Sequence, residues 1–145
     1  MGRRLVTDKI PEDSTAEARD GGAGRSCLIV DGSRVIRLVA GKILESLGFT
    51  VVEAEDAEAG LAAVEERMPD AVLVDWDLGS MSGVAFMKAV RESAGEAAAP
   101  RVLFCSGQTG VERIREAVEA GADEYIMKPF DSEIIESKLA QAGLL

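Results

Sequence analysis

Short apolar runs alternate with segments of helical periodicity over most of the chain. The runs predicted to be strands cover about 26–31, 50–54, 71–75, 101–105 and 124–127. The predicted helices cover about 33–47, 57–68, 83–93 and 132–142, and a further helix, fourth in order, precedes the last strand. Strands that alternate with helices in this way predict βαβ crossovers and a parallel sheet covered on both faces.

Helical spacing also predicts the apolar face and the ends of several helices. In the first helix the apolar residues at i, i+4 spacing are Val35, Val39, Ile43 and Leu47. In the fourth helix the residues predicted to point inward are Val111, Ile114 and Val118. Thr109 and Glu112 have the spacing of a capping box for that helix. Gly48 and Gly121 are placed to end the first and fourth helices, and Asp131 is placed to cap the last one.

These elements predict an α/β fold with a doubly wound, flavodoxin-like (βα)5 architecture. The expected five-stranded parallel sheet has the strand order 2-1-3-4-5, in which the first and third strands flank the switch point. Asp31 and Asp75 end these two strands and are therefore expected to lie beside each other. Ser106 and Lys128 end two further strands. Because open α/β sheets bind ligands outside the carboxyl ends of their strands, the four residues together predict a site.

A carboxylate, a hydroxyl and an ammonium at one edge of a sheet suit phosphoryl chemistry. Two neighbouring carboxylates persist when a cation relieves their repulsion, and Mg²⁺ suits a site of one or two carboxylates, waters and a phosphate oxygen. Asp75 is then placed as the nucleophile that forms an acyl phosphate, while Lys128 and Ser106 hold phosphoryl oxygens. For Asp31 taken alone, capping of the first helix is an equally open interpretation.

Composition narrows the range of functions. A length of 145 residues fits one domain, and we expect a flexible tail at residues 1–25 followed by a single domain at 26–145. A net charge of -10 argues against nucleic-acid binding, and the absence of histidine excludes Ser-His-Asp and Cys-His mechanisms. A chain without histidine can receive a phosphoryl group from phosphohistidine but cannot donate one. Without an apolar membrane-spanning stretch or a signal peptide, and with Cys27 and Cys105 expected as buried free thiols, a cytoplasmic protein is predicted.

Several segments together resemble the CheY-like receiver domain of response regulators. They are Leu28-Ile29-Val30-Asp31, Val72–Asp77, Gly83, Cys105-Ser106-Gly107 and Gly121–Phe130, and the resemblance covers about residues 26–145. It implies that a histidine kinase or a histidine phosphotransfer protein phosphorylates Asp75. It also implies that Ser106 and Tyr125 form a switch pair, which reports phosphorylation to the face built by the fourth helix, the fifth strand and the fifth helix.

The chain departs from the receiver pattern at the expected metal site. Receivers usually carry two adjacent acids after the first strand, whereas Asp31 is followed by Gly32. The resemblance implies Mg²⁺ ligands from Asp31, Asp75 and the backbone carbonyl of Asp77, and the missing acid is expected to weaken the affinity for the metal. We hypothesise that the Asp77 side chain partly restores the lost charge. Gly79, where the family often has proline, is expected to loosen the loop after the third strand.

The resemblance implies a single-domain response regulator, a monomer or weak dimer without an output enzyme, that signals by binding another protein. About 15 residues follow Phe130, and the fifth helix is expected to use them. One alternative is a pseudo-receiver that binds its partner without phosphorylation, for which Gly32 is the supporting feature. Another is a phosphatase similar to the haloacid-dehalogenase family, suggested by Asp75-Trp76-Asp77. Phosphorylation by acetyl phosphate would separate the first alternative from the receiver, and turnover of a small phosphoester would support the second.

Overall fold

The predicted strands and helices are present in the computed structural model, which describes residues 24–95, 99–107 and 111–145. The strands are β1 (Ser26–Val30), β2 (Thr50–Ala54), β3 (Ala71–Asp75), β4 (Arg101–Ser106) and β5 (Glu124–Met127). The helices are α1 (Arg34–Ser46), α2 (Ala57–Glu66), α3 (Gly83–Ala94), α4 (Val111–Glu119) and α5 (Ser132–Gln141). The largest difference from the predicted ends is in α2, which stops two residues early because the residue before Pro69 is biased away from helical geometry.

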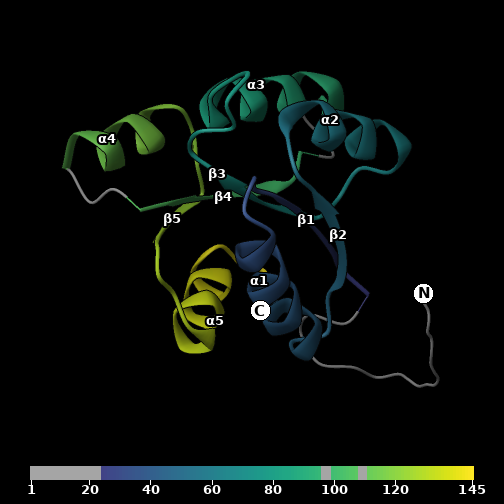
Figure 1. Ribbon diagram of the computed structural model, residues 1–145, viewed down its shortest axis with the longest axis vertical. Coiled ribbons are helices and arrows are strands. Elements are labelled where there is room, and N and C mark those ends of the chain that lie inside the picture. Colours follow the sequence, from purple (N-terminus) through teal and green to yellow (C-terminus); the bar gives the residue numbers. More distant parts are fainter. Residues whose placement is uncertain (1–23, 96–98, 108–110) are drawn as a thin grey trace.

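All strand pairs in the sheet are parallel, and the strand order is β2-β1-β3-β4-β5. Helices α1 and α5 cover one face of the sheet, and α2, α3 and α4 cover the other (Figure 1). The predicted doubly wound, flavodoxin-like fold is therefore confirmed. Val30 pairs with Val74, and Asp75 pairs with Cys105, so the carboxyl ends of the three central strands lie at one edge.

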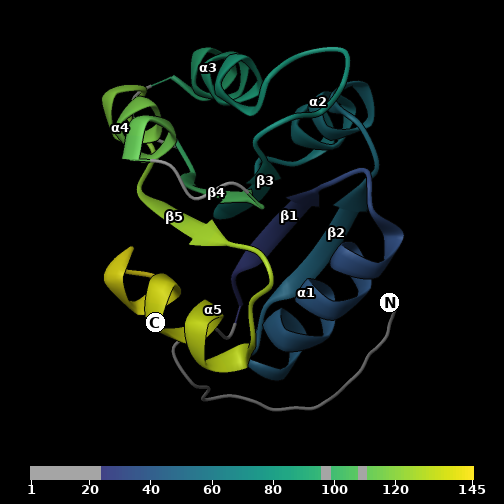
Figure 2. The ribbon, with the colours of Figure 1, turned by 60° about the vertical axis from the view of Figure 1, so that its left-hand side comes forward.

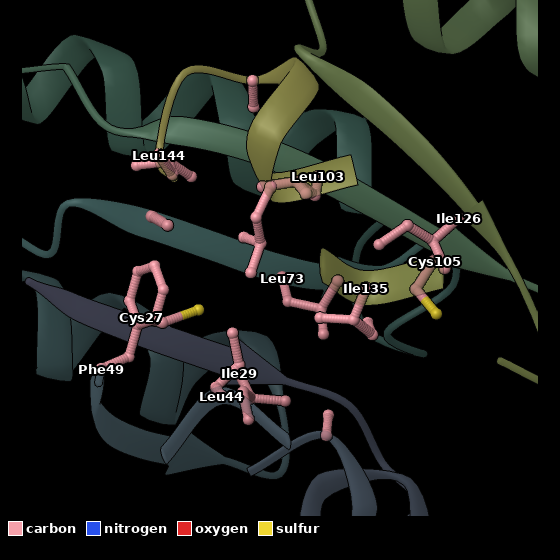
Figure 3. Packing of buried hydrophobic residues seen from close by; sticks show 14 residues of the cluster. Cys27, Ile29, Leu44, Phe49, Leu73, Leu103, Cys105, Ile126, Ile135 and Leu144 are labelled. Atoms are coloured by element: carbon pink, nitrogen blue, oxygen red, sulfur yellow. The ribbon is translucent and has the colours of Figure 1, made fainter. Parts of the chain in front are cut away.

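Two hydrophobic cores fill the space between the sheet and the two helix layers. Alternate residues of the strands point to opposite faces, as expected for buried parallel strands. Figure 3 shows the core under α1 and α5, where strand residues such as Ile29 and Leu73 pack against Leu44 and Ile135. The second core, under α2, α3 and α4, has Phe86 and Phe104 among its members.

The buried face of α1 differs from the predicted one. Ala40, Gly41 and Leu44 are buried, whereas Val35 is 66% exposed and Val39 is also exposed. A row at i, i+4 spacing winds slowly around an α-helix because four residues exceed one turn of 3.6 residues. The row therefore starts in solvent and approaches the core at the other end of the helix, where Ile43 and Leu47 are partly buried and pack against the first core.

The prediction for α4 was also wrong in its buried face. Ala117 is buried, whereas Ile114 and Val118 are exposed, Val118 by 65%. These two side chains line a groove of about 570 Å³ between α4, β5 and α5 instead of packing on the sheet. Figure 2 shows β5 running between α4 and α5 at one edge of the sheet. The predicted capping box includes Thr109, which lies outside the described residues. The side chain of Val111, which was predicted to point inward, is also outside what the structure describes.

The predicted helix ends are confirmed where the structure describes them. Gly48 and Gly121 both have φ of 97°, a left-handed backbone that favours glycine after a helix. The Asp131 side chain accepts a hydrogen bond from the Ile134 N–H at 2.9 Å, so Asp131 caps α5. Most of the predicted tail at residues 1–25 lies outside the described residues.

Both cysteines are free and buried, as predicted. Burial raises the pKa of the Cys27 thiol to about 12, because a thiolate would lose its hydration there. Burial likewise raises the pKa of Cys105 to about 12, although the Lys128 charge opposes the shift. Both side chains therefore behave as small hydrophobic groups. No helix within the described ranges is long and apolar enough to cross a membrane.

Candidate functional site

Asp31, Asp75 and Lys128 meet at the carboxyl edge of the sheet. The Lys128 ammonium donates a hydrogen bond to Asp31 Oδ2 at 2.8 Å and lies 3.5 Å from Asp75 Oδ1. The Asp31 side chain is 4% exposed, against 19% for Lys128 and 21% for Asp75. The structure thus brings together three of the residues singled out in the sequence, and one cation bridges two carboxylates.

Asp31 is held by the start of α1 but does not cap it. Its Oδ1 accepts a hydrogen bond from the Ser33 N–H at 2.8 Å. Ser33 is the N-cap, because its hydroxyl accepts from the Ile36 N–H at 3.3 Å. On the other side, Arg37 donates to the Asp31 carbonyl at 2.6 Å and pairs with Glu53 at 3.0 Å. The capping interpretation of Asp31 is therefore wrong, and both of its carboxylate oxygens are engaged.

The end of β3 is fixed by backbone hydrogen bonds on both sides of Trp76. The Trp76 N–H donates to the Cys105 carbonyl at 3.0 Å, and the Trp76 carbonyl accepts from the Gly83 N–H at 2.7 Å. Gly83 is the first residue of α3, and a Cβ there would lie 2.5 Å from the Asp75 carbonyl oxygen. The chain can therefore pass this close to the nucleophile only with glycine at position 83.

The environment of Asp75 disfavours its ionised form. Burial raises the pKa of Asp75, and the negative charge of Asp31 raises it further, while Lys128 opposes both effects. For Lys128, burial lowers the pKa, but the hydrogen bond and charge of Asp31 together with the charge of Asp75 outweigh it, and the pKa is raised. The lysine therefore stays cationic, and the carboxylate pair holds more negative charge than one ammonium neutralises.

Ser106 and Tyr125 belong to the neighbouring strands β4 and β5. Ser106 is buried and lines a pocket of about 640 Å³ together with Asp75, and its carbonyl accepts from the Lys128 N–H at 2.8 Å. The Tyr125 ring is half-buried and packs against Trp76, with ring centroids 6.3 Å apart. Ser106 therefore lies near Asp75, the predicted nucleophile. Tyr125 lies next to Trp76, the residue that follows Asp75 in the sequence. The Lys128–Pro129 peptide bond is cis.

One side chain in this pocket, Arg113, was not predicted from the sequence. Arg113 of α4 places its guanidinium 4.7 Å from the centre of the Trp76 ring, which is a cation–π contact. It lines the same pocket as Asp75 and Ser106. Arg113 is remote in sequence from the nucleophile and belongs to a helix surface of mixed charge, so only the packing of α4 reveals its position.

The residues present fit a hydrated Mg²⁺ but form no closed cage. Two carboxylates, Asp31 and Asp75, meet the usual demand of Mg²⁺ for one or two carboxylates with retained waters. Asp77 lines the same pocket as Asp31 and Asp75, and its Oδ1 accepts a hydrogen bond from the Gly79 N–H at 3.0 Å. Within the described ranges no three Asp, Glu, Cys or His residues cluster as metal ligands.

Gly32 leaves room for the missing acid. A Cβ at position 32 would have its nearest neighbour, the Glu55 carbonyl oxygen, 3.9 Å away, which is ordinary van der Waals contact. We therefore expect Gly32→Asp to raise the Mg²⁺ affinity by roughly 10- to 100-fold, because it adds a carboxylate beside Asp31 and Asp75. Mg²⁺ titration followed by Trp76 fluorescence measures this affinity. Gly32→Ala is the matched control, and an equal affinity in all three proteins would contradict the expectation.

Comparisons with known proteins agree with this geometry. A family model described as "Response regulator receiver domain" matches residues 27–140. The phosphate regulon transcriptional regulatory protein PhoB of Klebsiella pneumoniae is 34% identical over 115 residues, which cover 79% of this chain and 50% of PhoB. The chain thus spans about half the length of PhoB.

Relatives from chemotaxis match over more of their own length. The chemotaxis protein CheY of Pseudomonas aeruginosa is 31% identical over 113 residues, which cover 77% of this chain and 90% of that protein. The structure of Vibrio cholerae chemotaxis protein CheY4 matches with a TM-score of 0.75 and 28% identity, and the match covers 85% of this chain and 100% of CheY4.

Proposed function

The chain belongs to the response regulator receiver domain family, and we propose that it accepts a phosphoryl group from phosphohistidine on Asp75. Receiver domains are signalling modules that take phosphoryl groups from histidine kinases or phosphotransfer proteins, and they are not output enzymes. The observation that carries the proposal for this chain is the Lys128 ammonium, 2.8 Å from Asp31 and 3.5 Å from Asp75 at the carboxyl edge of the sheet.

In the proposed reaction a carboxylate oxygen of Asp75 attacks the phosphorus of the donor. The new P–O bond forms as the P–N bond to the donor's imidazole breaks, and the imidazole leaves with the electron pair. Lys128 and the Ser106 hydroxyl are placed to hold phosphoryl oxygens, which carry the charge of the transition state. Asp31, Asp75 and the backbone carbonyl of Asp77 would hold Mg²⁺, which supplies charge neutralisation when bound; receiver domains generally bind this metal.

The output that we propose is phosphorylation-dependent protein binding at the groove between α4, β5 and α5. Ser106 and Tyr125 would couple the site to this groove, since Ser106 shares a pocket with Asp75 and Tyr125 lines the groove itself. Exposed apolar residues supply the contact surface that a protein partner needs, and they are Ile114, Val118, Met127 and Ile134.

We further propose a receiver domain at residues 26–145 preceded by a flexible tail, acting as a single-domain regulator in the cytoplasm. The match to 90% of the length of P. aeruginosa CheY supports the single-domain proposal. We expect a monomer or weak dimer. Its target is expected to be a protein and not a nucleic acid, because the net charge of the chain is -10.

Labelling with acetyl phosphate tests the proposal. In the presence of Mg²⁺, intact mass is expected to show one added phosphoryl group, and peptide mapping is expected to place it on Asp75. Without Mg²⁺ the labelling should slow, because the charge of the carboxylate pair would be neutralised by Lys128 alone. A protein that takes no label from acetyl phosphate and shows no spectral change with Mg²⁺ and beryllofluoride would still be a receiver by fold, and the phosphorylation-independent alternative would replace our proposal.

A further inference from the structure

Arg113 is a cation that lines the same pocket as Asp75. Its guanidinium stacks on the Trp76 ring, which in turn contacts Phe104 with ring centroids 5.2 Å apart. Trp76 is half-buried and its backbone is held by hydrogen bonds on both sides. The indole therefore offers Arg113 a stable platform at the edge of the pocket of about 640 Å³ that contains Asp75.

The two cations near Asp75 belong to two different pockets. Lys128 lines a pocket of about 450 Å³ with Asp31 and Gly32, while Arg113 lines the larger one. Both pockets include Asp75. Lys128 is committed to Asp31 by a hydrogen bond of 2.8 Å. A group that enters the larger pocket therefore approaches Asp75 from the side on which Arg113 is the neighbouring cation.

We propose that Arg113 is a specificity-determining residue, which favours phosphoryl donors with an anionic leaving group over donors with a neutral one. The inference rests on the proposed phosphorylation of Asp75. In an in-line displacement the leaving group lies on the side of the phosphorus away from the attacking oxygen. Asp31, Asp75 and Asp77 line the smaller pocket and would hold Mg²⁺ there, so the larger pocket is where the leaving group has room.

The leaving groups of two small donors differ in the charge that they develop. With acetyl phosphate the P–O bond to the acetyl group breaks and acetate leaves with the electron pair and a negative charge. With phosphoramidate the P–N bond of the protonated form breaks and ammonia leaves without charge. Arg113 attracts the negative charge that develops on acetate. The nitrogen of phosphoramidate goes from positive to neutral and never carries a negative charge that Arg113 could attract, so relative to the free donor Arg113 favours only the acetyl phosphate transition state.

The test compares labelling rates for the two donors in the wild type, Arg113→Gln and Arg113→Lys. Arg115→Gln is the matched control, since Arg115 is an exposed residue of the same helix and its substitution removes the same charge. Intact mass gives the rates at fixed Mg²⁺ and ionic strength, and circular dichroism checks the fold. The quantity of interest is the ratio of the acetyl phosphate rate to the phosphoramidate rate, which a general loss of structure would not change.

We expect Arg113→Gln to lower this ratio of rates about fivefold, because one partly exposed charge is removed. Arg113→Lys keeps the charge and should have a ratio close to the wild-type value. Arg115→Gln should leave the ratio at the wild-type value. Equal losses with both donors, or the same change in Arg113→Gln and Arg115→Gln, would overturn the inference and leave the proposed function standing. A wild type that takes no label from either donor would overturn both.

Discussion

Replacing Asp75 with asparagine is expected to abolish labelling by acetyl phosphate and, at the same time, to stabilise the fold. An amide cannot form the acyl phosphate, so the loss of label should be complete. Burial and the charge of Asp31 raise the pKa of Asp75, which means that the native structure disfavours its carboxylate. Asparagine removes that charge, while Lys128 keeps its hydrogen bond to Asp31 at 2.8 Å. We expect a gain on the order of 1 kcal/mol near neutral pH.

The gain should depend on pH in a defined direction. At a pH below 3.8, the ordinary pKa of an aspartate side chain, the carboxyl is protonated in the folded and unfolded states, and the two proteins should be equally stable. As the pH rises from there through the raised pKa of the folded state, the wild type loses stability relative to Asp75→Asn, because its folded state holds the proton more tightly. Above that pKa the difference should be constant.

Urea denaturation without Mg²⁺, at several pH values, measures the difference. Glu65→Gln is a suitable control because Glu65 is an exposed acid of α2, far from the site, and should change stability little. If Asp75→Asn were less stable than the wild type at neutral pH, the attraction of Lys128 would outweigh the burial of Asp75 and its repulsion from Asp31. A labelled Asp75→Asn would show that another residue is the acceptor.

The fold and the strand-end residues of the site were predictable because both follow from local pattern. Each strand is a short apolar run, and parallel pairing brings the carboxyl ends of such runs to one edge whatever their distance in sequence. Asp31, Asp75 and Lys128 could therefore be placed together although 97 positions separate the first from the last. The carboxylate, hydroxyl and ammonium groups of the residues at the strand ends then indicated phosphoryl chemistry.

The features that the sequence did not reveal depend on packing between distant elements. The exposed position of Val118 follows from how α4 packs beside β5 and α5, where Val118 lines a groove, and periodicity does not predict that packing. The same holds for Arg113, whose contact with the Trp76 ring depends on how α4 packs. The position of the end of β3 also depends on Gly83. A side chain at this position would collide with the backbone of Asp75, which lies 8 residues earlier in the sequence.

Glycine at position 83 is expected to be a condition for both the fold and the site, so that Gly83→Ala should have the largest effect on stability of the substitutions considered. Its Cβ would lie 2.5 Å from the Asp75 carbonyl oxygen and 2.8 Å from Phe104 Cε1. The first contact is with backbone and the second with a buried ring, so neither can move away at little cost. Overpacking of this kind costs about 3 kcal/mol.

The same substitution should also slow the proposed reaction. Relief of the contact requires α3 or the end of β3 to shift, and the Gly83 N–H bond to the Trp76 carbonyl at 2.7 Å would then weaken. A displacement of about 1 Å at a reacting group can cost about 100-fold in rate. We expect the acetyl phosphate labelling rate of folded Gly83→Ala to fall by a comparable factor. Gly107→Ala is the matched control, because a Cβ at position 107 meets no atom of the described residues within 4 Å. Denaturation midpoints and labelling rates close to the wild type in both variants would mean that α3 and the end of β3 adjust freely, and the dependence of the site on Gly83 would then be refuted.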